Sequence, residues 1–241
     1  MDIRHRHAMY SMKRLAPIFF LLVTVIGLGS CNRKWKKATK VAVYLETVRF
    51  EGNTSQNAGP ETLLYKSGHM RIINIQLIGE RYQADGIDFE RNESVQYDFA
   101  TGSALAYQFD IPQGTYSDFD VDLQAGNAGT EPGIKLLMVW VNSASEEVNV
   151  EFKLRRQDVY HCVAKEVDGS EQIDLVADEN RDMVITLDFD QWFSFITPEM
   201  WDDAERFGTS NFQVKIDESN NSDLYHQIAD RIGDGISVQY Q

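Results

Sequence analysis

Apolar and polar residues alternate along most of the chain after residue 40, with the period of two expected of β-strands. The pattern begins at residues 41–45 and returns at residues 73–77 after a turn-rich stretch. Further runs of this kind occupy residues 94–99, 104–111, 116–123, 134–141, 148–154, 158–163 and 183–189. Short runs separated by Gly, Asn, Asp and Pro predict an all-β fold, specifically an antiparallel β-sandwich, because no crossover helices separate the strands.

The alternation gives way to two short helices near the C-terminus. Residues 197–199, Thr-Pro-Glu, supply a capping hydroxyl, a proline at the first helical position and an acid in the first turn, so a helix of about ten residues is expected there. Leu224, Ile228 and Ile232 then recur at helical spacing and predict a second helix with one buried face. Residues 212–216 alternate between the two helices, as a strand would.

The first thirty residues have a different character. Lys13 and Arg14 precede an uncharged run over residues 15–30. A basic segment before a short apolar run is typical of a secretory signal, and this run falls short of the roughly 20 apolar residues that span a bilayer. We therefore expect residues 1–30 to be a signal peptide. Met1 and Met12 both precede the apolar run, so either could be the start of the chain, and Met12 gives the more compact signal.

The apolar run ends at Leu28-Gly29-Ser30-Cys31, which resembles the lipobox of bacterial lipoproteins. The resemblance implies cleavage between Ser30 and Cys31 and attachment to membrane lipid through acylated Cys31. Residues 31–40 then form a basic tether, and residues 41–241 a single sandwich domain. Each basic residue gains about 1 kcal/mol beside an anionic membrane. The alternative is a solvated linker that its charges keep extended.

Two later segments carry a wider resemblance. Residues 106–116 contain Pro112-Gln113-Gly114-Thr115-Tyr116, which resembles the strand, Pro-x-Gly-x-Tyr, strand hairpin of small β-sandwich lipoproteins from Bacteroidota. Residues 185–193 resemble the strand ending in Trp-Phe near their C-termini. The resemblance implies a sandwich and a lipid-anchored envelope location, and it adds no catalytic residue. The basic tether favours an outer-membrane anchor that faces the periplasm over display on the cell surface.

The cysteines fit this interpretation. If Cys31 holds lipid, Cys162 has no partner for an intramolecular disulfide. Alternation places Cys162 and its neighbour His161 on opposite faces of a strand, so they cannot bind one metal together. A buried, inert thiol is expected.

Three carboxylates also share one strand. Asp118, Asp120 and Asp122 alternate with apolar residues, so they face one side together. The segment resembles the start of a calcium loop, but Leu123 stands where the turn glycine belongs and Gly129 where the bidentate glutamate belongs. We therefore expect a solvated polar face and no metal site.

The tryptophans raise the question of a binding platform. Trp140 lies in an apolar run and Trp192 closes a strand, so both are expected in the core. Trp201 is less determined and is the one candidate ligand-binding residue, since an exposed aromatic ring can stack on a sugar.

Composition narrows the function without naming a ligand. The 241 residues carry a net charge of −14 and 43% hydrophobic residues, which is typical of a folded domain. Nucleic acid is not an expected partner, because binding its phosphates needs clustered basic residues on the folded body. No nucleophile elbow, zinc motif, phosphate loop or dinucleotide fingerprint is present, so neither catalysis nor a cofactor is expected. The sequence predicts a non-catalytic binding or structural module of the cell envelope with an envelope protein or glycan as partner. The alternatives are a glycan or small-ligand binder using exposed aromatics and, with less support, a hydrolase.

Overall fold

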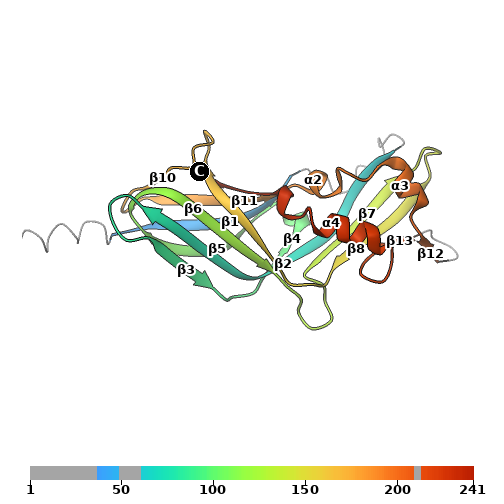
Figure 1. Cartoon of the computed structure of the whole chain (residues 1–241), viewed down its shortest axis with the longest axis horizontal. Helices are drawn as coiled ribbons and strands as arrows, with labels where there is room; N and C mark the ends of the chain where they lie inside the picture. Colours follow the sequence, from blue (N-terminus) through green and yellow to red (C-terminus); the bar gives the residue numbers. More distant parts are fainter. Residues whose placement is uncertain (1–36, 49–60, 209–212) are drawn as a thin grey trace, which may run out of the picture.

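One strand, β2 (Thr62–Arg81), runs through most of the elongated molecule and organises the fold (Figure 1). Its 20 residues correspond to roughly 65 Å of extended chain. The computed structural model describes residues 37–48, 61–208 and 213–241, and all statements on the fold concern these residues.

Two further stretches of chain follow the direction of β2 across the sheet, one beside β2 and one beside the first, and each is broken once near the middle. β6 (Gly114–Ala125) pairs with the second half of β2, and β7 (Ile134–Val141) pairs with the first half. β8 (Glu147–Leu154) then pairs with β7, and β9 (Asp158–Glu166) pairs with β6. Because every break falls at the same level, the sheet divides there into two lobes while its strands continue from one to the other.

We call the two halves the barrel lobe and the helix lobe (Figure 1). In the barrel lobe the sheet curls into a half-barrel, with strand order β2, β6, β9, β14 (Ile236–Tyr240), β11 (Asn180–Leu187), β1 (Ala38–Thr47) and β5 (Ser103–Pro112). The short strands β3 (Ile87–Arg91) and β4 (Val95–Asp98) pair with the other edge of β2, and β10 (Ile173–Leu175) pairs with β6. The helix lobe contains β7, β8, β13 (Gln213–Ile216), β12 (Arg206–Phe207) and the helices α2 (Phe189–Phe193), α3 (Pro198–Asp203) and α4 (Ser222–Ala229). Single 3₁₀ turns occupy Phe99–Thr101 and Gly233–Gly235.

The all-β prediction is confirmed, but the prediction of purely antiparallel pairing is wrong. β1 pairs in parallel with β11, β13 with β8, and β14 with β9. Parallel neighbours require long crossover connections. Those leading to β13 and β14 contain helices, which the sequence argument placed after the sheet rather than between paired strands. The described strands form one continuous hydrogen-bonded path, so the finer expectation of a two-sheet sandwich is not confirmed.

Several predicted elements differ in extent. The strand expected to end in Trp-Phe stops at Leu187, because the Asp188 carboxylate accepts a hydrogen bond from the Asp190 amide and caps helix α2. Helix α3 begins as predicted, with Thr197 as its cap, but ends at Asp203. The following residues form β12, which pairs with the expected strand β13.

The Pro-x-Gly-x-Tyr segment is not a hairpin. β5 and β6 flank it but do not pair, since β5 pairs with β1 while β6 pairs with β2, β9 and β10. The segment is a corner that carries the chain from one wall of the half-barrel to the other. The hydroxyl of the fully buried Tyr116 donates to the Pro112 carbonyl at 2.6 Å and holds this corner.

β2 exchanges partners at a bulge. Its inward residues are Met70 and Ile72 before the bulge and Ile75 and Leu77 after it, so the two halves differ in phase. Ile73, expected to face the core with Ile75 and Leu77, is instead the half-buried bulge residue. The extra residue rotates the strand and lets both lobes bury an apolar face.

The first prediction concerns the close contact between β2 and β7. A Cβ atom on Gly68 would collide with the Lys135 carbonyl oxygen and lie 2.9 Å from a ring carbon of Phe99. Gly68→Ala should therefore lower the free energy of unfolding by about 1–3 kcal/mol, as overpacking does. Gly233→Ala is the matched control, because its nearest atom would be 3.6 Å away in the Tyr160 ring. Urea unfolding measures the stability of both variants. Equal unfolding midpoints for Gly68→Ala and Gly233→Ala would contradict the prediction.

Candidate functional site

Aromatic side chains hold the helices on the sheet of the helix lobe. The Trp201 ring of α3 stacks on Trp140 of β7, with 5.9 Å between centroids and 23° between planes. The Trp140 indole N–H donates to Asp202 of α3 at 3.1 Å. The Tyr65 hydroxyl of β2 donates to Asp190 of α2, also at 3.1 Å. Helices α2 and α3 are thus each fixed by ring contacts and by a hydrogen bond to a carboxylate.

This arrangement corrects the role expected of Trp201. Its side chain is only 3% exposed, because α3 turns the ring inward onto Trp140. A ring in that position is part of the core and offers no face to a sugar. Trp140 and Trp192 are also buried, as predicted.

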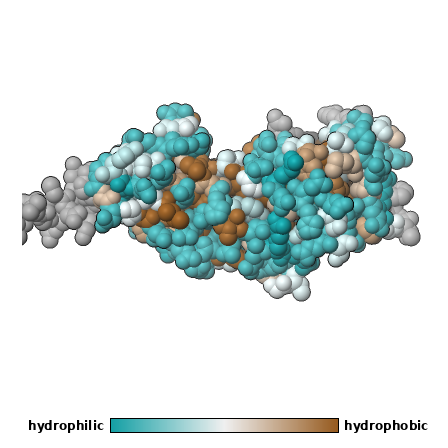
Figure 2. Space-filling model, in the orientation of Figure 1, coloured by the Kyte–Doolittle hydropathy of each residue, from teal (hydrophilic) through white to brown (hydrophobic). Residues whose placement is uncertain are grey.

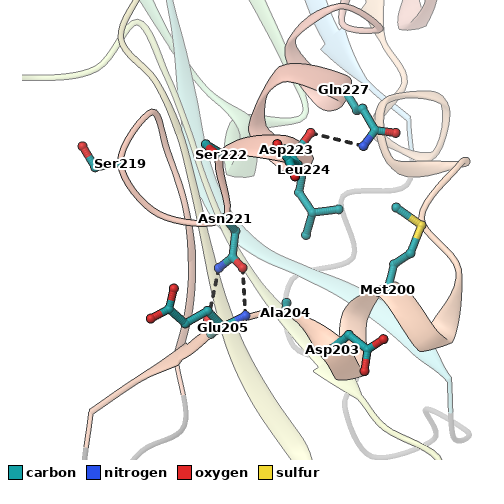
Figure 3. A pocket seen from close by; sticks show the side chains of 10 residues that line it. All are labelled: Met200, Asp203, Ala204, Glu205, Ser219, Asn221, Ser222, Asp223, Leu224 and Gln227. Atoms are coloured by element: carbon teal, nitrogen blue, oxygen red, sulfur yellow. Dashed lines mark hydrogen bonds between the residues drawn. The ribbon is translucent and has the colours of Figure 1, made fainter.

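The candidate site is a groove between α3 and α4 on the surface of the helix lobe (Figure 3). Its volume is about 480 Å³, within the usual range of small-ligand sites. Apolar atoms of Met200 and Leu224 lie among polar and acidic groups. The lining residues are Met200, Asp203, Ala204, Glu205, Ser219, Asn221, Ser222, Asp223, Leu224 and Gln227.

Asn221 holds the two sides of the groove together. Its Oδ1 accepts from the Glu205 amide at 2.8 Å, and its Nδ2 donates to the Glu205 carbonyl at 3.1 Å (Figure 3). Nδ2 also donates to the Lys215 carbonyl at 2.7 Å. Its backbone is left-handed, with φ 48°, a conformation that Asn tolerates better than most residues. One side chain therefore connects β13, the start of α4 and the chain after α3.

The chemistry of the groove is that of an acidic binding surface. Asp203, Glu205 and Asp223 contribute carboxylates, and the described residues of the lining include no Lys, Arg, His or Cys. Such a surface attracts cationic groups through charge. In the part of the chain that the structure describes, no three His, Cys, Asp or Glu side chains lie close enough together to hold a metal ion.

The acidic face of β6 has the predicted orientation. Asp118 is exposed, Asp120 and Asp122 are half-buried, and the alternate residues face the core. Asp122 is also 2.6 Å from Nδ1 of His161 on β9. Ile78 and Val163, both partly exposed, flank Asp120 across the strands. Figure 2 shows scattered apolar patches on a mostly hydrophilic surface. Burial, with the charges of Asp118 and Asp122, raises the pKa of Asp120 above its usual value.

Cys162 is buried as predicted, and His161 faces solvent on the opposite side of β9. Loss of hydration, with a contribution from Asp122, raises the pKa of the Cys162 thiol to about 11. The thiolate, which is the reactive form, is therefore scarce near pH 7.

Ser30, Cys31 and the proposed signal peptide lie outside the described residues. Of the basic tether, Lys37 and Lys40 are described, and Lys37 forms an exposed ion pair with Asp178 at 3.2 Å. Sequence reasoning missed the groove, because its two sides come from separate helices. An asparagine directly before the helix starting at Ser222 was the one local signal of a special backbone position.

The second prediction concerns Asn221. Asn221→Ala removes three hydrogen bonds and places a residue with a poorer left-handed preference at a positive φ, whereas Asn221→Gly removes the hydrogen bonds alone. Both variants should lose stability, and the alanine variant should lose about 1 kcal/mol more. Thermal and urea unfolding measure this difference. Equal losses would show that the backbone conformation carries no cost.

The third prediction concerns Asp120. Its raised pKa means that the ionised form is disfavoured in the folded protein, so stability should increase as pH falls and the carboxyl becomes protonated. Asp120→Asn should raise the melting temperature slightly at pH 7 and weaken this local dependence on pH. Asp118→Asn, at an exposed position of the same strand, is the control. A lower melting temperature for Asp120→Asn would contradict the prediction.

Comparison with protein-family models, curated proteins and solved structures finds no match. Among the described residues, none of the helices is long and apolar enough to cross a bilayer.

Proposed function

We propose that this protein is a lipid-anchored, non-catalytic binding module of the cell envelope, held in the outer membrane by acylated Cys31 and facing the periplasm. The observation that carries the proposal is the sequence Leu28-Gly29-Ser30-Cys31, directly after a short apolar run with basic residues before it. On this proposal the curled sheet of the barrel lobe is the sandwich body of the lipoproteins that the sequence resembles.

The position of the described body supports this arrangement. Lys37 follows Cys31 by six residues, which span at most about 20 Å. The described chain enters the barrel lobe at the end of the molecule away from the helix lobe (Figure 1). An anchor at Cys31 therefore keeps the barrel lobe beside the membrane and directs the helix lobe away from it.

The groove between α3 and α4 is then the membrane-distal binding surface. β2, which runs from one lobe through the other, alone extends roughly 65 Å, far more than the Debye length of about 8 Å in physiological salt. The negative charge of the groove is accordingly screened from the membrane surface. Its acidic lining favours a partner that presents a cationic group, such as an envelope protein or an amino-bearing glycan.

The fourth prediction tests the anchor. Cys31→Ser removes the acceptor sulfur while retaining the basic and apolar parts of the signal, so metabolic lipid labelling should disappear. Mass spectrometry of the N-terminus, on protein from host membranes, should find a diacylated or triacylated Cys31 in the wild type, since two or more chains give stable attachment.

Cys162→Ser is the matched control, because Cys162 is buried inside the barrel lobe and should not accept lipid. This variant should keep the label. An unmodified wild-type N-terminus, or wild-type protein found entirely in the soluble fraction, would reject the proposal.

A further inference from the structure

A second cavity lies on the barrel lobe beside β5, β1 and β11, and Arg91 at the end of β3 also belongs to its lining. Its volume is about 620 Å³, larger than that of the groove in the helix lobe. The lining combines both signs of charge with two amides and two aromatic rings. These lining residues are Lys40, Val41, Ala42, Tyr44, Arg91, Gln108, Phe109, Asp110, Asn180 and Asp182.

The strand register explains the hollow. Ala42 lies between Gln108 of β5 and Asp182 of β11, and the adjacent row on the same face contains Asp110, Lys40 and Asn180. All of these side chains except that of Ala42 are long or polar. A methyl group surrounded by larger neighbours forms the floor of a depression.

The charges in this cavity are unpaired. Lys40 and Arg91 form no ion pair with any described residue, and neither do Asp110 and Asp182. Lys40 is even the direct cross-strand neighbour of Asp110. Arg91 instead lies over the Phe109 ring, 5.5 Å from its centroid. Two cations and two carboxylates thus line one cavity without neutralising one another.

We propose that this cavity binds the phosphoethanolamine headgroup of a membrane phospholipid. Lys40 and Arg91 would hold the anionic phosphodiester, and Asp110 and Asp182 would accept hydrogen bonds from the primary ammonium. A primary ammonium suits carboxylates as acceptors, whereas a quaternary choline is usually held by a cage of several aromatic rings. The described lining has two aromatic rings, Tyr44 and Phe109, and Arg91 lies over the second, so the lining forms no cage of several rings around a choline.

The membrane as the source of the headgroup rests on the proposed function. Lys40 is nine residues from Cys31, so the cavity lies within about 30 Å of an acylated cysteine by chain length. An anchor at that distance gives the headgroup a high effective concentration, so a weak site suffices. Occupation would orient the barrel lobe against the bilayer.

The test uses the whole chain carrying Cys31→Ser, so that no acyl chain contributes. Titration with soluble glycerophosphoethanolamine, followed by NMR chemical shifts, should show saturable binding with a Kd on the order of millimolar. Glycerophosphocholine should bind at least about fivefold more weakly, because it cannot donate hydrogen bonds to the carboxylates. No saturable binding, or equal affinity for the two compounds, would overturn the inference.

Variants locate the binding. Ala42→Leu fills the floor of the cavity and should abolish the shifts, whereas Ser237→Leu, an exposed position on β14 of the same sheet, should leave them unchanged. Lys40→Gln and Asp182→Asn should each weaken binding about tenfold, the value of one charge-assisted hydrogen bond. Urea unfolding midpoints show that each variant is folded. Unaltered binding in Ala42→Leu would overturn the assignment to this cavity.

Binding to lipid vesicles tests whether the headgroup comes from the membrane. The Cys31→Ser chain should cosediment with phosphatidylethanolamine–phosphatidylcholine vesicles and not with pure phosphatidylcholine vesicles. Binding of the soluble compound without binding to vesicles would overturn the membrane assignment. Because the acylation of Cys31 is measured separately by mass spectrometry, a failure of this inference is distinguishable from a failure of the proposed anchor.

Discussion

The fold depends on a single strand that has to pair with two different sets of neighbours. β2 pairs with β7 over one half of its length and with β6 over the other half. At the exchange, the Arg71 amide donates to the Gly133 carbonyl and the Gly126 amide donates to the Arg71 carbonyl. These hydrogen bonds keep the backbone of β2 satisfied where its partners change, and the bulge at Ile73 gives each lobe its own buried face. The two lobes are therefore parts of one sheet.

The break between β13 and β14 determines where helix α4 lies. The chain leaves the sheet after β13, forms α4 and returns as β14, and these two strands lie beside β8 and β9 respectively. Helix α4 thus lies in the break between β13 and β14. Buried rings cover the helix–sheet contact, including Phe152 of β8 against Tyr225 of α4, with 6.3 Å between centroids. The groove that we assign to binding lies between α4 and α3, the helix that precedes β12.

Charge is distributed differently in the two cavities. The charged residues that line the groove of the helix lobe are all acidic, whereas the described lining of the barrel-lobe cavity contains both signs without internal ion pairs. Elsewhere the described charges do pair, as in Arg181 with Glu166 and Lys153 with Glu151, both at 2.7 Å. Since the sheet can bring opposite charges together in this way, the separated charges around Ala42 are a specific property of that surface. The proposed membrane-proximal and membrane-distal ends would thus differ in the ligands they attract.

The sequence by itself determined the local features: the period of two in most strands, the cap at Thr197, the polar face of β6 and the burial of Cys162 all depend on neighbours along the chain. Alternation could not show that β2 is 20 residues long, because the bulge at Ile73 changes the phase of its inward residues. Only the tertiary structure decided the parallel pairs and the burial of Trp201. It also brought Glu205 to Asn221 and set Asp182 beside Ala42. The physical reason is that each of these contacts joins segments distant in the chain, and such contacts follow from the packing of whole strands and helices rather than from local residue preference.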